Sequence, residues 1–300
     1  AYMAEAFVWH QKALKGEVPF DASLEQQVPL FEKALKLEED LSVRARINRR
    51  YRNRSLDYGY VAKAVEIGER YVEDAPTIST YLRDRKDEAM AFVKSIYSKL
   101  GYAGEAIPFF ENLVQQKPQH FGFRLMYADV LLQAGKPNEA MNILKEGHKI
   151  LSAANDERPA YLLRIAKVYL KKDDAEAAKK WLNEVDAEQL SFQQKLMLAE
   201  LYLTMSETEK AVAALPEPSD AEVPNEKAAL SYVKAMVQEA KGNLDKAVKE
   251  YDSTLALNPY HLKARARLAE LLQKLGESDE AQQVRQQGES LAIPPGPDLG

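Results

Sequence analysis

The sequence predicts an all-α solenoid in which antiparallel helix pairs stack side by side. Three observations predict it: a motif that recurs at intervals close to 34 residues, a helical period in the apolar residues of each unit, and a turn in the middle of each unit. A repeat of this length is one helix pair, which can bury its apolar faces only against its neighbours. The 300 residues would suffice for two domains if the fold were globular.

An alanine that follows a turn by a few residues marks each unit. Ala106 and Ala140 are 34 residues apart, and so are Ala247 and Ala281. Other intervals range from 33 to 42 residues, which places insertions between helix pairs. The series predicts about seven units, marked by Ala64, Ala106, Ala140, Ala178, Ala211, Ala247 and Ala281.

Within a unit, each element has its own signal. The first helix carries apolar residues at helical spacing, as at Leu125 and Ala128. A glycine such as Gly135 follows, because glycine tolerates the left-handed backbone that ends a helix. The second helix begins with an acidic residue such as Glu139, which favours the positive end of the helix dipole. Proline, as at Pro118, marks its end.

These units resemble tetratricopeptide repeats over roughly residues 45 to 288. The stretch GNLDKAVKEYDSTLALNP, Gly242 to Pro259, is the closest local match. The resemblance implies a right-handed superhelix whose first helices line a concave face. The small residue of the family's first helix appears as Ala128, Ala166, Ala199, Ala235 and Ala269, and the bulky residue of its second helix as Phe110, Leu144, Leu182, Leu215 and Tyr251.

Some units depart from this pattern. Arg52 and Lys94 stand at the small position of the first helix, and Gly68 stands at a bulky position of the second. We therefore expect these pairs to pack differently. Pro216 and Pro218 fall where a second helix should continue, which predicts that this helix is short.

The sequence divides into three parts. Residues 1–44 read as N-terminal helices of a partial or divergent repeat, 45–290 as the solenoid and 291–300 as an unstructured tail. Residues 5 to 14 resemble a second helix without its first, so we expect a fragment of a longer array or an end that leans on another subunit. Self-association through open repeat ends follows as one possible mode of assembly.

Composition restricts the classes of function. With no cysteine, thiolate nucleophiles, disulfides and cysteine-based metal sites are excluded. The formal net charge of −5 argues against a nucleic-acid binder, which needs a concentrated basic surface. No run approaches the length of apolar sequence that a membrane-spanning helix requires.

No enzyme motif is present, whether a phosphate-binding loop, a dinucleotide-binding glycine pattern, HExxH or GxSxG. The four histidines are His10, His120, His148 and His261, which lack the short spacing of metal ligands. His120 and His261 neighbour prolines between units, where polar side chains commonly face solvent. The sequence predicts no catalytic residue, no metal site and no cofactor.

One basic run stands apart. RARINRRYRNR, Arg44 to Arg54, holds six arginines in eleven residues, which cannot share one helix face. Three interpretations remain open: a solvated helix in which Arg44 pairs with Asp40, a docking patch for an acidic partner, and a nucleic-acid contact. The absence of a second basic stripe disfavours the last.

The resemblance also implies which side chains face a partner: those at positions two, five, nine, twelve and thirteen of each unit. A peptide-carboxylate clamp, known in this family, is not expected, because Phe92, Gly122 and Met126 stand where an amide and two basic residues are needed. The candidate partner-binding residues are Arg46, Arg49, Asn53, Glu88, Ser95, Lys99, Asp129, Gln133, Lys167, Lys171 and Glu200.

These observations favour a scaffold that binds another protein, or an extended segment of one, through the concave groove. Two alternatives keep the fold and change the task. The array could be a periplasmic scaffold that recruits a modifying enzyme in a bacterial envelope or exopolysaccharide-export complex, or a self-assembling structural element. Both the periplasm and the cytoplasm are compatible with the sequence.

Overall fold

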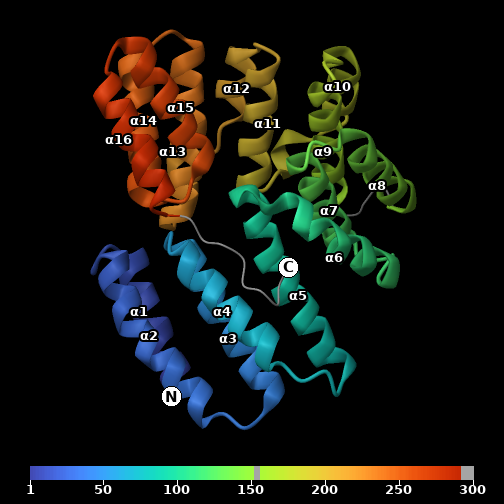
Figure 1. Ribbon diagram of the computed structural model, residues 1–300, viewed down its shortest axis with the longest axis vertical. Coiled ribbons are helices and arrows are strands. Elements are labelled where there is room, and N and C mark those ends of the chain that lie inside the picture. The colour runs from blue at the N-terminus through green and yellow to red at the C-terminus, as the bar shows by residue number, and fades with distance from the viewer. Residues whose placement is uncertain (152–155, 292–300) are drawn as a thin grey trace.

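The computed structural model describes residues 1–151 and 156–291, and within these ranges the chain is helical with no β-strand (Figure 1). Among the described residues, no helix combines the length and apolarity that crossing a membrane requires. The α-helices are α1 (Tyr2–Leu14), α2 (Phe20–Leu37), α3 (Leu41–Asp57), α4 (Val61–Asp74), α5 (Thr80–Tyr97), α6 (Ala103–Gln116), α7 (Phe121–Gln133), α8 (Pro137–Ile150), α9 (Arg158–Lys171), α10 (Ala175–Leu182), α11 (Phe192–Thr204), α12 (Thr208–Ala214), α13 (Pro224–Ala240), α14 (Leu244–Leu257), α15 (Leu262–Leu275) and α16 (Ser278–Glu289).

Consecutive helices pack as antiparallel hairpins, from α1 with α2 to α15 with α16. The predicted solenoid of helix pairs is therefore confirmed. The seven predicted units correspond to the hairpins α3/α4 to α15/α16. Between the α-helices, the described ranges also contain three short elements: the π-helical turn η1 (Ser98–Tyr102) and the 3-10 turns η2 (Ala187–Gln189) and η3 (Pro218–Asp220).

The repeated alanines lie where helices cross. All seven alanines that mark the units are at most 2% exposed, and each lies on the second helix of its hairpin. The small residues predicted on the first helices are equally buried, at 2% or less. A larger side chain at either position would separate the two backbones, because packed interiors leave little free volume.

The hairpin α3/α4 exchanges small and large residues between its helices. Arg52, at the small position, is only 7% exposed, and its guanidinium lies 4.1 Å from the centre of the Phe92 ring. Room for its stem comes from Gly68, where an added Cβ would lie 3.6 Å from Arg52 Cδ and 2.6 Å from Val93 Cγ2. The expectation that this pair packs differently is confirmed.

The second helix of the sixth hairpin is short, as its prolines predict. Helix α12 has 7 residues and ends at Ala214, and Leu215 then adopts an extended backbone before Pro216. The turn η3 and the extended residue Ala221 lead from there to α13.

Helices α1 and α2 form a hairpin of their own. Its apolar side is continuous with that of α3, since the Phe31 ring stacks on Tyr51 with 4.8 Å between ring centres. Helix α3 begins at Leu41, a few residues before the predicted boundary. Of the tail predicted for 291–300, all residues after Leu291 lie outside the described residues.

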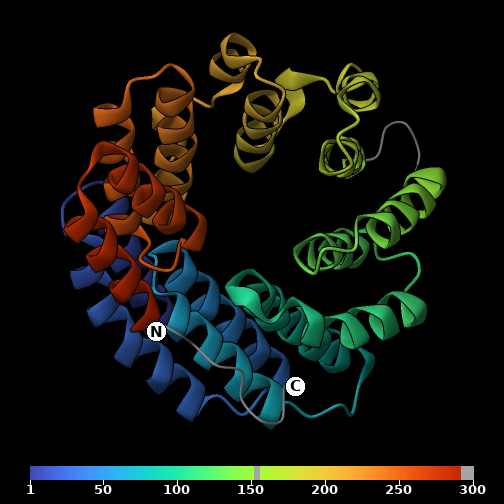
Figure 2. The ribbon, with the colours of Figure 1, turned by 45° about the horizontal axis from the view of Figure 1, so that its top comes forward.

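The superhelix returns to its own beginning. Helix α13 contacts α3, and Figure 2 shows the hairpins arranged around a ring-like turn. At this seam, which we define as the contact of Phe20 and the α3–α4 turn with α13 and residues 257–260, Tyr260 packs into the apolar cluster of α4 and α5. Gly59, with φ +86°, passes so close to the Leu257 carbonyl that a Cβ would lie 2.3 Å from its oxygen. On the other side of the seam, Lys227 Nζ lies 5.5 Å from the centre of the Phe20 ring.

Candidate functional site

The first helices of successive hairpins form the inner wall of the superhelix. Helices α3, α5, α7, α9, α11 and α13 contact one another in series, while the second helices lie outside them (Figure 2). Each first helix therefore has one face toward its partner helix and one toward the enclosed side. The predicted binding residues lie on these helices and on η1, and none of them is buried.

Six of the predicted residues are exposed: Arg46, Arg49, Asn53, Lys99, Gln133 and Lys171. The other five are half-buried: Glu88, Ser95, Asp129, Lys167 and Glu200. Two clusters gather most of them. One lies on α3 and α5, and the other lies across η1, α7, α9 and α11.

In the first cluster, α3 and α5 share a carboxylate. Glu88 accepts a hydrogen bond from Arg85 at 2.6 Å and lies 3.9 Å from Arg49, whose side chain is 54% exposed. These side chains border a small pocket that Arg52, Gly68 and Tyr71 also line. One carboxylate is thus shared among the basic groups, and the cluster keeps an excess of positive charge.

The basic run of α3 is divided between interior and surface. Arg44 donates to the backbone carbonyls of Leu35 and Glu38. Asp40 does not pair with Arg44, so that prediction is wrong: its carboxylate caps α3 by accepting from the amide of Ser42 at 2.7 Å. Arg54 lies over the Tyr58 ring. The exposed remainder is Arg46, Arg49 and Arg50.

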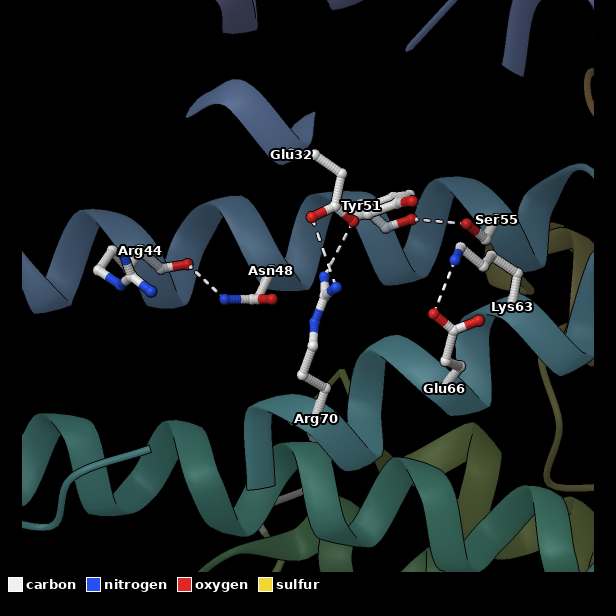
Figure 3. A network of polar contacts seen from close by, with 8 residues as sticks. All are labelled: Glu32, Arg44, Asn48, Tyr51, Ser55, Lys63, Glu66 and Arg70. Atoms are coloured by element: carbon white, nitrogen blue, oxygen red, sulfur yellow. Dashed lines mark hydrogen bonds and ion pairs between the residues drawn. The ribbon is translucent and has the colours of Figure 1, made fainter. Parts of the chain in front are cut away.

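Polar contacts hold α3 between its neighbours. Arg70 of α4 forms an ion pair of 3.1 Å with Glu32 of α2, and this pair spans α3 near Tyr51 (Figure 3). Asn48 donates to the Arg44 carbonyl at 3.1 Å, along the helix itself. The Arg70–Glu32 pair thus connects the first two hairpins and fixes the position of α3, which carries the exposed arginines.

The second cluster is built around an ion pair. Arg164 of α9 donates twice to one oxygen of Asp129 on α7, through Nε at 3.0 Å and Nη2 at 2.7 Å. Desolvation would raise the pKa of Asp129, but the charges of Arg164, Lys167 and Lys99 outweigh it and hold that pKa below its usual value. The pair is therefore ionised and neutral overall.

Lys99, Lys167 and Glu200 lie near this pair, with Lys99 exposed and the other two half-buried. Loss of hydration lowers the pKa of Lys99 and of Lys167, with Lys263 of α15 contributing to both shifts. Desolvation also raises the pKa of Glu200, which the charges of Lys263 and Lys167 partly offset. Neighbouring protein reduces the hydration of a charged group in this way even where, as at Lys99, the side chain remains in contact with water.

Three predicted residues do not join a cluster. The Ser95 hydroxyl donates to the Phe92 carbonyl of its own helix at 2.7 Å. Gln133 and Lys171 are the last residues of α7 and α9. They remain predicted contact residues at the edge of the inner wall.

Sequence reasoning missed Arg164 and Lys263. The position rule could have found Lys263, because it stands at position two of the unit whose small residue is Ala269. Arg164 stands at position six, outside the rule. Its role as the partner of Asp129 becomes evident only when α7 and α9 lie side by side.

Two histidines cap helices. His120 Nδ1 accepts from the amide of Phe123 at 3.2 Å, and His261 Nδ1 accepts from that of Ala264 at 3.1 Å. Four residues after each histidine, a buried arginine donates back to the carbonyl of a proline, Arg124 to Pro118 and Arg265 to Pro259. His120 is exposed, as expected, whereas His261 is half-buried, so the expectation that both histidines face solvent is wrong for His261. In the described ranges, no group of histidine, aspartate and glutamate side chains is arranged to hold a metal ion.

His261 predicts a pH dependence of stability. Burial, with Lys263 and Lys99 nearby, lowers its pKa to about 4, whereas an unfolded histidine titrates near 6.5. The unfolded state therefore binds the extra proton below pH 6.5, and the stabilisation present above that pH is lost as the pH falls toward 4. Relative to His261→Asn, which keeps a capping side chain, the wild type should lose about 1–2 kcal/mol between pH 7.5 and 5 in urea unfolding.

The matched control is His120→Asn, which makes the same exchange at the equivalent cap of α7 and measures the effect of the exchange itself. Equal pH dependence in the wild type and His261→Asn would contradict the assignment of His261 as a neutral, half-buried cap.

The comparisons with known proteins agree with this architecture. A family model described as tetratricopeptide repeat matches residues 99–150 and 238–288, and a second of the same description matches residues 159–187. A comparison with curated proteins found no significant match.

Several solved structures share the fold. A tetratricopeptide repeat protein from Parabacteroides merdae aligns over 90% of this chain and 98% of its own, with TM-score 0.53 and 13% identity. The APC/C hetero-tetramer Cut9-Hcn1 aligns over 89% of this chain and 50% of its own, with TM-score 0.56 and 14% identity. The human IFIT1 dimer with PPP-AAAA aligns over 93% of this chain and 65% of its own, with TM-score 0.56 and 14% identity. At such identities the likeness concerns the fold. With repeat models on three segments and a buried alanine on the second helix of each predicted unit, the chain belongs to the tetratricopeptide repeat family.

Proposed function

We propose that the chain is a binding scaffold that holds an extended segment of a partner protein against its inner wall. The observation that carries this proposal is that each first helix has a buried packing face and an accessible face on the inner wall. The repeated alanines and their apolar neighbours are buried, whereas the predicted inner-wall residues are exposed or half-buried and mostly charged. A wall of this kind adds contact area with each repeat and requires no new fold.

Binding, rather than catalysis, also suits the chemistry of the wall. The Asp129–Arg164 and Arg85–Glu88 contacts are ion pairs, and neither contains a nucleophile next to a base. The charges vary along the wall, from the exposed arginines of α3 to the mixed cluster of α7, α9 and α11. Such variation in charge determines the orientation and register of a bound partner more than it increases the affinity.

The double variant Arg46→Glu with Arg49→Glu tests the proposal. Both side chains are exposed, so their reversal should leave the fold intact while it repels an acidic partner. In affinity capture from the source lysate followed by mass spectrometry, we expect at least one captured protein to be reduced by about tenfold or more.

The control is Lys246→Glu with Lys249→Glu, an equal charge change at exposed positions of α14, on the outer side of its hairpin. Equal capture by the wild type and the α3 variant would count against a partner site at this end of the wall.

Self-assembly is a second candidate, favoured by one observation. Phe7 and Val8 on α1 are 58% and 51% exposed, which is unusual for adjacent large apolar side chains. The mass of the purified chain, measured by light scattering over a range of concentrations, separates the two proposals. A constant monomer mass rejects assembly through α1, and a mass that rises with concentration supports it.

A further inference from the structure

Three lysines from distant parts of the chain meet on the inner wall. Lys99 lies in η1, Lys167 on α9 and Lys263 in the first turn of α15. Tyr260, three residues before Lys263, packs against the same apolar cluster as Leu100, the residue after Lys99, and this contact places Lys263 near Lys99. The effect of the Lys263 charge on the pKa of Lys99, Lys167 and Glu200 agrees with this placement. We call Lys99, Lys167 and Lys263 the lysine cluster.

The closed turn produces this juxtaposition. Helix α15 follows residues 257–260, which pack against the α3–α4 turn and against the apolar cluster of α4 and α5. The next element after α5 is η1, which carries Lys99. The seam therefore brings the last hairpin to the third, and an open superhelix would not hold Lys263 beside Lys99.

The charges at this place do not balance. Asp129 and Arg164 neutralise each other in their ion pair. Glu200 then remains as one negative charge against the three of the lysine cluster, so two positive charges are left over. Within the described part of the chain, no lysine of the cluster has a carboxylate oxygen within 4.0 Å, although ion pairs are frequent elsewhere.

Three positive charges without a close counter-charge repel one another. Desolvation and the charge of Lys263 both lower the pKa of Lys99 and of Lys167, which agrees with this repulsion. An anion bound among the three ammonium groups would relieve their mutual repulsion.

We propose that the lysine cluster binds an acidic segment of the partner protein, with aspartate or glutamate carboxylates lying between Lys99, Lys167 and Lys263. This inference rests on the proposed function and names the chemistry of the partner. A peptide suits the site better than a nucleic acid because other first helices of the wall carry carboxylates: Asp129 on α7, Glu200 on α11 and Glu239 on α13. A peptide can place uncharged residues opposite these carboxylates, whereas a phosphate backbone carries charge at every step.

The test is fluorescence anisotropy of the full chain with a fluorescein-labelled, glutamate-rich peptide of about ten residues as the probe. We expect Lys99→Gln, Lys167→Gln and Lys263→Gln each to weaken Kd by about 3- to 10-fold, and the triple variant by more than about 30-fold. Lys249→Gln on α14 removes an exposed lysine outside the wall and should leave Kd unchanged.

A second variant tests the role of the seam without removing charge. Gly59→Val should weaken Kd about as much as Lys263→Gln, because it displaces α15. Gly135→Val introduces the same residue at a turn with φ +73° and no atom within 4 Å, and should not weaken Kd. Circular dichroism of each variant checks that the helices are retained.

Peptide binding that is unchanged in the triple lysine variant would overturn this inference. Preferential binding of an oligoadenylate of similar charge would overturn it too, in favour of a nucleic-acid ligand. If peptide binding depends on Arg46 and Arg49 and not on the lysines, the inference fails while the scaffold function stands. If neither set of variants changes capture of any lysate protein, the proposed function itself fails.

Discussion

Gly59→Val is expected to destabilise the chain by about 2–4 kcal/mol and to open the superhelical turn. The left-handed backbone of Gly59, at φ +86°, costs a β-branched residue about 1–2 kcal/mol. In addition, a Cβ 2.3 Å from the Leu257 carbonyl oxygen cannot be accommodated, so residues 257–260 must move away. Urea unfolding should show the loss of stability, and small-angle X-ray scattering should show a larger radius of gyration.

The matched variant is Gly135→Val. Gly135 has φ +73° at the turn between α7 and α8, and a Cβ there would meet nothing within 4 Å. It should therefore lose only the backbone contribution, about 1–2 kcal/mol, with no change in the radius of gyration. Equal losses and equal scattering profiles for the two variants would show that the seam contributes nothing.

Gly147→Val is the second substitution with a large expected effect, and it should lower the free energy of unfolding by about 3 kcal/mol. A Cβ on this residue of α8 would lie 2.5–2.7 Å from three atoms of the Tyr161 side chain on α9. Tyr161 is fully buried, and its hydroxyl donates to the Phe121 carbonyl at 3.1 Å. The ring cannot move without losing that bond and its packing, so overpacking is the dominant cost. Urea unfolding measures the change.

Gly104→Val provides the comparison, because Gly104 lies in α6 with nothing within 4 Å of an added Cβ. We expect no loss there, since any residue other than proline has a higher helix propensity than glycine. A double variant of Gly147→Val with Tyr161→Leu should recover part of the loss if the two side chains clash directly. If Tyr161→Leu restores none of the stability that Gly147→Val removes, a contact other than the one with Tyr161 causes the loss.

The repeat architecture could be predicted from the sequence because it depends on local and periodic signals. An alanine such as Ala178 or Ala211 is required wherever two helices cross, so its spacing reports each hairpin. Pro216 and Pro218 shorten α12 through their own backbone chemistry. Such features need no knowledge of how distant parts of the chain meet.

The seam and the lysine cluster could not be predicted in this way. Closure depends on how small rotations between successive hairpins accumulate over one turn, and these rotations follow from packing rather than from any single motif. The same holds for Arg52, whose burial depends on the space that Gly68 leaves on another helix. A position rule can place Lys263 on the inner side of α15, but only the closed turn brings it beside Lys99.

The measurement that tests the central claim most directly is a cross-link across the seam. The chain has no cysteine, so Phe20→Cys with Lys227→Cys introduces a unique pair at side chains that lie 5.5 Å apart, from Nζ to ring centre. If the superhelix closes on itself, a short bis-maleimide should link the two cysteines within one monomer, and the Gly59→Val background should reduce the yield. A monomer that stays unlinked in the otherwise wild-type chain would contradict the closed turn and, with it, the lysine cluster.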